Sequence, residues 1–123
     1  MRNRLIALTF CILLTACSTA GSQNAIDTII DAGLTCDNPR TWEVGDSVVP
    51  DVFDVAMTCD TGEYGIKVFS GGDLDQLHAY FTKLGEGLGG MLGSHLCSPS
   101  GYLLQAENDM AEEAFAAYCD ALE

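Results

Sequence analysis

The chain has 123 residues, with 18 acidic side chains against five basic ones and a formal net charge of −13. A surface this acidic repels nucleic acid and anionic lipid headgroups. The composition therefore excludes DNA binding, RNA binding and docking of a basic patch on a membrane. The length suits one small domain.

The first residues have the order of an export signal. Arg2 and Arg4 precede an apolar run from Leu5 to Leu14, and Thr15-Ala16-Cys17 follow it. A run of about ten apolar residues suits the centre of a signal peptide, whereas a membrane-spanning helix needs roughly 20. A conventional secretory signal cut nearby and an uncleaved anchor are the alternatives.

Leu14-Thr15-Ala16-Cys17 resembles the lipobox of bacterial lipoproteins. The resemblance implies that residues 1–16 are a lipoprotein signal peptide, cut between Ala16 and Cys17. It also implies that the Cys17 thiol carries diacylglycerol with palmitate-type chains, with a further N-acyl chain where the cell adds one. Two or more chains give stable anchoring, at about 0.8 kcal/mol for each buried CH₂. The implied location is the extracytoplasmic side of a bacterial cell membrane or outer membrane, and no other cofactor is expected.

The part that follows the signal is more acidic still. Residues 17–123 keep three basic side chains, at Arg40, Lys67 and Lys83, against all 18 carboxylates, which gives a formal net charge of −15. Such a surface serves solubility, or it attracts a basic protein partner or divalent cations. No calcium loop of the D-x-D-x-D-G kind is present. We expect a flexible tether over residues 17–23 and a single globular domain over residues 24–123.

Four cysteines belong to this domain, at Cys36, Cys59, Cys97 and Cys119. An even count in a small exported domain is typical of two disulfides, and four cysteines allow three connectivities. We favour Cys36–Cys59 with Cys97–Cys119, because each pair joins neighbouring elements. A zinc site is disfavoured, since no C-x-x-C pair is present and the histidines do not cluster with the cysteines.

Hydrophobic periodicity predicts the elements of the first half. Asn24 is expected to cap a helix that ends near residues 33–39. The apolar face of this helix would carry Ile26, Ile29, Ile30, Gly33 and Leu34. A short strand is expected at residues 42–44. Alternation over residues 52–59 and within residues 63–70 predicts two further strands, joined by a turn as a hairpin.

In the second half, Asp73 with Gln76 predicts the start of another helix, and a glycine-rich stretch over residues 85–93 ends it. Residues 102–106 are predicted to be the last strand. Asp109 with Glu112 is expected to cap a terminal helix. The apolar stripes of the two helices would comprise Leu74, Leu77, Phe81 and Leu84, and then Ala111, Phe115, Tyr118 and Leu122.

This order of elements predicts an α+β fold: a small antiparallel sheet of three or four strands, with about three helices packed on one face. The layout resembles small, mostly uncharacterised lipoproteins of actinobacteria, through Ala32-Gly33-Leu34-Thr35-Cys36, Met57-Thr58-Cys59 and residues 64–69. The resemblance implies a location and a fold, and it implies no known reaction. The Cys97 and Cys119 pair departs from the pattern.

Two patterns that suggest catalysis do not have the context that catalysis needs. Residues 85–90 match G-x-G-x-x-G, but a predicted helix precedes them where a dinucleotide fold has a strand. We interpret them as a flexible connector, or as an apolar flap through Leu88, Met91 and Leu92. Ser94 or Ser98, His78 or His95, and Asp73 supply the residue types of a hydrolase triad. Nothing in their spacing brings them together, and a G-x-S-x-G turn is absent.

Two further interpretations concern single residues. His78 is expected to be half-buried or at an edge, and His95 is expected to be exposed in a connector. Trp42 with Arg40 is either core packing or an exposed recognition spot. A domain of this size leaves little room for the groove of a glycosidase.

The sequence thus predicts a lipid-anchored binding module of the cell envelope, without a catalytic role and with an unknown partner. The alternatives are an envelope inhibitor, such as a lipoprotein that excludes a superinfecting phage, and a small envelope hydrolase. The expected partners are the membrane, through lipid, and a basic protein surface. The oligomeric state stays open. The candidate site residues are those of lipidation, cleavage and cross-linking, with no catalytic or metal-binding residue: Ala16, Cys17, Cys36, Cys59, Cys97 and Cys119.

Overall fold

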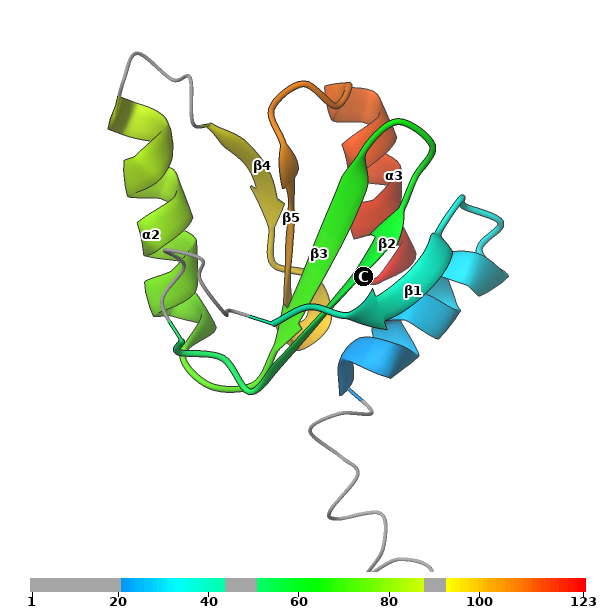
Figure 1. Ribbon diagram of the computed structural model, residues 1–123, viewed down its shortest axis with the longest axis horizontal. Helices are drawn as coiled ribbons and strands as arrows, with labels where there is room; N and C mark the ends of the chain where they lie inside the picture. Colours follow the sequence, from blue (N-terminus) through cyan, green and yellow to red (C-terminus); the bar gives the residue numbers. More distant parts are fainter. Residues whose placement is uncertain (1–20, 44–50, 88–92) are drawn as a thin grey trace, which may run out of the picture.

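The computed structural model describes residues 21–43, 51–87 and 93–123, in which an antiparallel sheet lies between helices on both of its faces (Figure 1). The five strands have the spatial order β1-β2-β3-β5-β4. An N-terminal helix covers residues 21–31, and the other elements follow in chain order: β1 Asp37–Thr41, β2 Val55–Asp60, β3 Gly65–Ser70, α2 Leu74–Glu86, β4 Ser94–Cys97, a 3₁₀ turn Pro99–Gly101, β5 Tyr102–Glu107 and α3 Glu112–Ala121. The predicted α+β class and the antiparallel sheet are confirmed.

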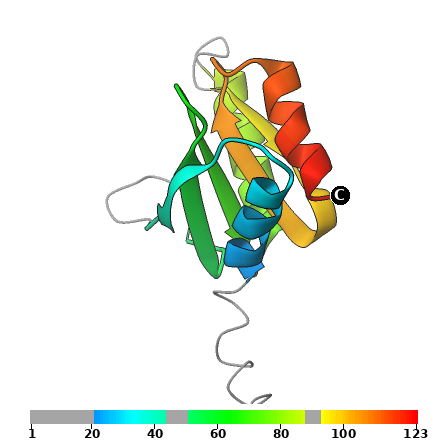
Figure 2. The same ribbon diagram turned by 90° about the vertical axis from the view of Figure 1, so that its right-hand side faces the viewer.

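The helices divide between the two faces of the sheet, so the expectation that all of them pack on one face is wrong. The N-terminal helix and α3 cover one face, side by side in both views, and α2 covers the other (Figures 1 and 2). The reason is that the central strands carry apolar residues at consecutive positions, which point to opposite faces. These neighbours are Ala56 with Met57, Val68 with Phe69, and Leu103 with Leu104.

The sheet has one strand that was not predicted and one that lies elsewhere than predicted. β4 was expected to be a connector, yet it pairs with β5 along its whole length and brings the strand count to five. The strand expected at residues 42–44 is wrong, since residues 42–43 form no strand and residue 44 lies outside the described residues. The edge strand is β1, which ends at Thr41 and whose five residues are all exposed. Its Asn38 has a positive φ and its pairing with β2 is irregular, both of which protect an edge strand from further pairing.

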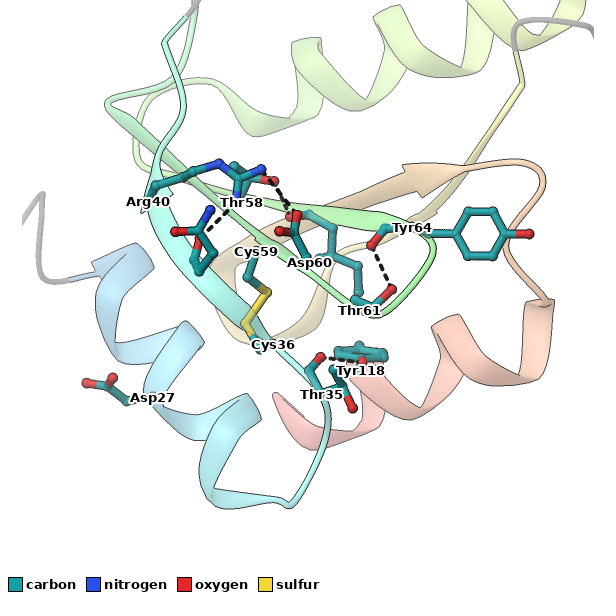
Figure 3. The surroundings of a disulfide bond; sticks show 12 residues. Asp27, Thr35, Cys36, Arg40, Thr58, Cys59, Asp60, Thr61, Tyr64 and Tyr118 are labelled. Carbon is teal, nitrogen blue, oxygen red and sulfur yellow. Dashed lines mark hydrogen bonds and ion pairs between the residues drawn. A yellow bond between two sulfur atoms is a disulfide. The ribbon is translucent and has the colours of Figure 1, made fainter.

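Both predicted disulfides are present. Cys36 is bonded to Cys59, and Cys97 to Cys119, with Cα atoms 5.1 and 6.3 Å apart. The first links Cys36, directly before β1, to Cys59 near the end of β2 (Figure 3), and the second links β4 to α3. Each closes a loop of more than 20 residues, worth about 3 kcal/mol in the chain-entropy model.

The N-terminal helix begins before the residue expected to cap it. Residues 21–23 are already helical, and Ser22 is fully buried, so they belong to the domain rather than to a tether. The buried face accordingly runs Ser22, Ala25, Ile26 and Ile29, while Ile30 is 44% exposed. Asn24 therefore lies inside the helix and is no cap.

The helix ends where the sequence indicates. Gly33 has φ +86°, and its N–H and that of Leu34 donate to the carbonyls of Ile30 and Ile29. This is a Schellman ending, in which glycine takes the left-handed position at low cost. It turns the chain back so that Cys36 meets β2.

The two remaining helix starts differ in outcome. Asp73 caps α2 as predicted, because its carboxylate accepts a hydrogen bond from the Gln76 N–H at 3.0 Å. α3 begins after Ala111, with no side-chain cap, so the capping box of Asp109 and Glu112 is wrong. Phe115, Tyr118 and Leu122 of its predicted stripe are buried, whereas Ala111 is exposed.

Candidate interaction surface

A polar row crosses the sheet on the face that α2 partly covers. The strand register pairs Arg40 with Thr58, Thr58 with Lys67, and Lys67 with Gln105, and directly paired residues share a face. Gln105 pairs in turn with Leu96 on β4. We call Arg40, Thr58, Lys67 and Gln105 the polar row. It adjoins the apolar patch of Phe69 and Leu103 beneath α2.

Two of the three basic residues expected in the mature chain belong to this row. Arg40 forms an exposed ion pair with Asp60, with Nη2 and Oδ1 3.2 Å apart, and this pair is drawn in Figure 3. Lys67 places its Nζ 5.3 Å from the centre of the Trp42 ring, a cation–π arrangement. Among the described residues, Lys67 Nζ forms no salt bridge.

The surroundings of Lys67 disfavour its charge. Burial lowers the pKa of the Lys67 ammonium, the carboxylate of Glu107 acts in the opposite direction, and the charge of Arg40 lowers the pKa further. Burial is the largest of the three influences.

Trp42 itself is mainly a packing residue. Its ring contacts Phe53 and Phe69 at centroid distances of 6.3 and 5.9 Å, and the backbone N–H of Trp42 donates to the carbonyl of Ala56. Of the two roles expected for Trp42, packing describes most of its contacts. Arg40 does not stack on it but turns to Asp60.

A hollow of about 350 Å³ opens between α2 and the end of the sheet formed by β4 and β5. We call it the α2 hollow. Its apolar lining comes from Phe81 and Leu84 of α2, and its polar lining from Gln105, Glu107, Asn108 and Asp109 on β5 and the following turn. Gly93 and Ser94 complete the lining.

A second hollow of similar size lies beside Trp42 and Phe53. Glu43, Asp51 and Asp54 make it acidic as well. Its other lining residues are Thr41, Val55 and Ala56. Both hollows thus combine an aromatic side chain with carboxylates on a strongly acidic protein.

The residues considered for a hydrolase triad do not come together. Ser94 and Leu96 face α2, whereas His95 faces α3, where its ring stacks on Phe115 at 5.4 Å. His95 Nε2 lies 2.6 Å from the carbonyl oxygen of Met110. His95 is therefore partly buried in β4, and the expectation of an exposed connector histidine is wrong.

The other members of that set have separate partners. Ser94 Oγ accepts a hydrogen bond from Gln105 Nε2, and Asp73 caps α2. His78 is half-buried on α2, as expected, with Nδ1 3.4 Å from Thr82 Oγ1. Ser98 is exposed ahead of the 3₁₀ turn. Among the described residues no hydrogen bond joins a serine to a histidine.

The remaining predicted features lie wholly or partly outside the described residues. Ala16 and Cys17 do so, as do the apolar flap residues Leu88, Met91 and Leu92. The described part of the G-x-G-x-x-G match, residues 85–87, is the end of α2 and its cap. A helix therefore precedes the motif, which is the reverse of the order that a dinucleotide site needs.

Two features are absent from the described residues. In residues 21–43, 51–87 and 93–123, no three His, Cys, Asp or Glu side chains are grouped closely enough to hold a metal ion. The helices in that part of the chain are also too short or too polar to cross a bilayer.

The α2 hollow and the polar row were not foreseen as a site. A signal was present: Lys67 interrupts the apolar run of Ile66, Val68 and Phe69, so one face of β3 had to accommodate a charge. Gln105 interrupts β5 in the same way. Only the strand register shows that the two side chains are neighbours.

Comparison of the chain with protein-family models, with curated proteins and with solved structures finds no match in any of the three. The resemblance to lipoproteins therefore stays a prediction from the residues that carry it.

Proposed function

We propose that the protein is a lipid-anchored, extracytoplasmic binding module of a bacterial cell envelope, held by acyl chains on Cys17 and without a catalytic role. Removal of residues 1–16 would leave Cys17 four residues before the first described helical position, Gly21. The domain would then sit close to the membrane rather than on a stalk.

The pairing of the cysteines carries this proposal. All four cysteines of the described residues are used in two disulfides, which persist in oxidising compartments outside the cytoplasm. The four bond to one another, so none of them is left to pair with Cys17. The folded part thus has the chemistry of an exported protein, in agreement with the signal-like start of the chain.

A binding role is supported by the surface. No hydrogen bond joins a serine to a histidine among the described residues, while the α2 hollow and the hollow beside Trp42 offer aromatic and acidic linings. A net charge of −13 for the full chain favours a basic partner and hastens its association.

A pair of cysteine variants tests the anchor. Cys17→Ala should abolish the lipid-modified mature form, so that the domain is released from membranes or stays an uncleaved precursor. Cys11→Ala is the matched control, because Cys11 would leave with the signal and its loss should change neither the mass nor the fractionation of the mature protein. Unchanged mass and unchanged membrane fractionation of the Cys17→Ala variant would contradict the proposal.

A binding role needs its own test. Photocrosslinking in the native envelope tests whether one face of the domain binds a partner. One probe replaces exposed Asn108 beside the α2 hollow, and the other replaces exposed Asp27 on the N-terminal helix. A defined protein adduct from Asn108 and none from Asp27 is expected. Adducts from neither position would refute the binding role.

A further inference from the structure

Hydrogen-bond acceptors predominate among the polar side chains that line the α2 hollow. Glu107 and Asp109 present carboxylates, and Asn108 lies between them in the chain. Carboxylates accept hydrogen bonds and donate none at neutral pH. The rim therefore suits a ligand that is rich in donors.

Gln105 adds a buried acceptor to the wall of the hollow. The residue is only 8% exposed, and its Nε2 donates to Ser94 Oγ at 2.9 Å. Its Oε1 has no hydrogen-bond partner among the described residues. This oxygen is not fully buried, because every fully buried side-chain nitrogen or oxygen in that part of the chain has a partner. A carbonyl oxygen held in this way is ready to accept a hydrogen bond from a group that enters the hollow.

The opposite wall is apolar. Phe81 is 5% exposed and Leu84 is half-buried, both on α2. An aromatic ring with an aliphatic neighbour suits the methylene stem of a long basic side chain, whose charged head then reaches the acceptors. The volume of about 350 Å³ is enough for one such side chain.

We infer that the α2 hollow receives one arginine side chain of a protein partner, with the guanidinium among Gln105, Glu107 and Asp109 and its stem against Phe81 and Leu84. Arginine fits better than lysine, because its planar fork of five donors can serve several acceptors at once. The inference rests on the proposed binding role and names the chemistry that its partner must present.

The test is a titration of the purified full-length protein in detergent micelles, followed by ¹H–¹⁵N NMR, with N-acetyl-arginine amide as the probe. N-acetyl-citrulline amide is the control, because it has the same shape and no charge. Saturable shifts of the Gln105, Glu107 and Asp109 signals with the arginine probe, and none with the citrulline control, are expected. Equal shifts with both probes, or none with either, would overturn the inference.

A matched pair of variants locates the site. Glu107→Gln removes a carboxylate of the hollow and should weaken binding about fivefold or more, the effect of losing an ion pair worth about 1 kcal/mol. Glu113→Gln removes the same charge from an exposed position on α3 and should leave the affinity unchanged. Equal weakening by both would show that only the overall charge attracts the probe.

The remaining outcomes separate this inference from the proposed function. Saturable shifts of the same signals with calcium chloride, and none with the arginine probe, would mean a metal site and would overturn the inference. An envelope adduct from Asn108 without arginine binding would refute the inference alone. Absence of any adduct would refute the binding role itself.

Discussion

Removing the two disulfides one at a time should affect stability unequally. The paired variants are Cys36→Ala with Cys59→Ala, and Cys97→Ala with Cys119→Ala. The sequence separations are 23 and 22, so the chain-entropy model gives both cross-links nearly the same value, about 3 kcal/mol. Any difference between the variants must then come from packing.

Packing favours the first cross-link. Cys59 is completely buried near the end of β2 and Cys36 is 7% exposed, whereas Cys97 is half-buried and Cys119 is 9% exposed. Removing sulfur from the more enclosed site leaves the larger unfilled space, which adds roughly 1 kcal/mol. The expected losses are therefore about 4 kcal/mol for the first pair and about 3 kcal/mol for the second.

Thermal unfolding followed by circular dichroism measures both losses. For a domain of about 100 residues, 1 kcal/mol corresponds to roughly 4 °C or more, so the melting temperature should fall by about 16 °C for the first pair and 12 °C for the second. Urea unfolding gives the free energies independently. A larger loss for the second pair, or a loss below about 1 kcal/mol for either, would refute this reasoning.

Three further comparisons test the packing of the domain. Ser22→Ala should cost about 1–2 kcal/mol in urea unfolding, because Ser22 Oγ lies 2.9 Å from Ser70 Oγ in the core; no loss would mean that residues 21–23 are a tether after all. Gly72→Ala should lower the melting temperature far more than Gly62→Ala. Both glycines have positive φ, but of the two only Gly72 would place a Cβ in overlap with backbone, at the carbonyl oxygen of Val52. Equal melting temperatures for the two variants would contradict the backbone path at Gly72. Tyr118→Phe should cost about 1 kcal/mol at neutral pH, since the Tyr118 hydroxyl donates to the carbonyl of Thr35 at 2.6 Å. Burial, and secondarily the charge of Asp37, raises the pKa of Tyr118 in the folded protein, so the unfolded chain loses this proton first as the pH rises. The stability advantage of the natural protein over Tyr118→Phe should therefore be full below pH 10 and shrink above it. A stability advantage that grows with alkaline pH would refute this sign.

The elements that the sequence predicted best are those with a strong local signal. The hairpin of β2 and β3 follows from alternation and a turn, and the start of α2 from Asp73. The disulfides followed from the even cysteine count and from their places beside predicted elements. The signals for the hairpin and for the start of α2 lie within a few residues of those features, whereas the disulfides join cysteines 22 and 23 residues apart.

The features that the sequence did not predict depend on tertiary contacts. Residues 21–23 read as small and polar, and only the burial of Ser22 against β3 makes them part of a helix. β4 is four residues long, and its pairing with β5 gives it its extended form. The placement of α2 on the second face needed the register of three strands, which a single sequence does not specify.

The candidate surface was hidden for the same reason. Lys67 and Gln105 are 38 positions apart in the numbering and become neighbours only through the pairing of β3 with β5. Glu107 and Asp109 read as ordinary surface carboxylates until α2 places Phe81 opposite them. A site whose residues come from several strands can be recognised only when the pairing of those strands is known.

The intact mass of the protein purified from its own envelope tests the central claim most directly. The account predicts a chain that begins at Cys17 and carries diacylglycerol on that sulfur, with two disulfides in the remainder. A chain that keeps residues 1–16, or one whose Cys17 sulfur bears no lipid, would contradict it.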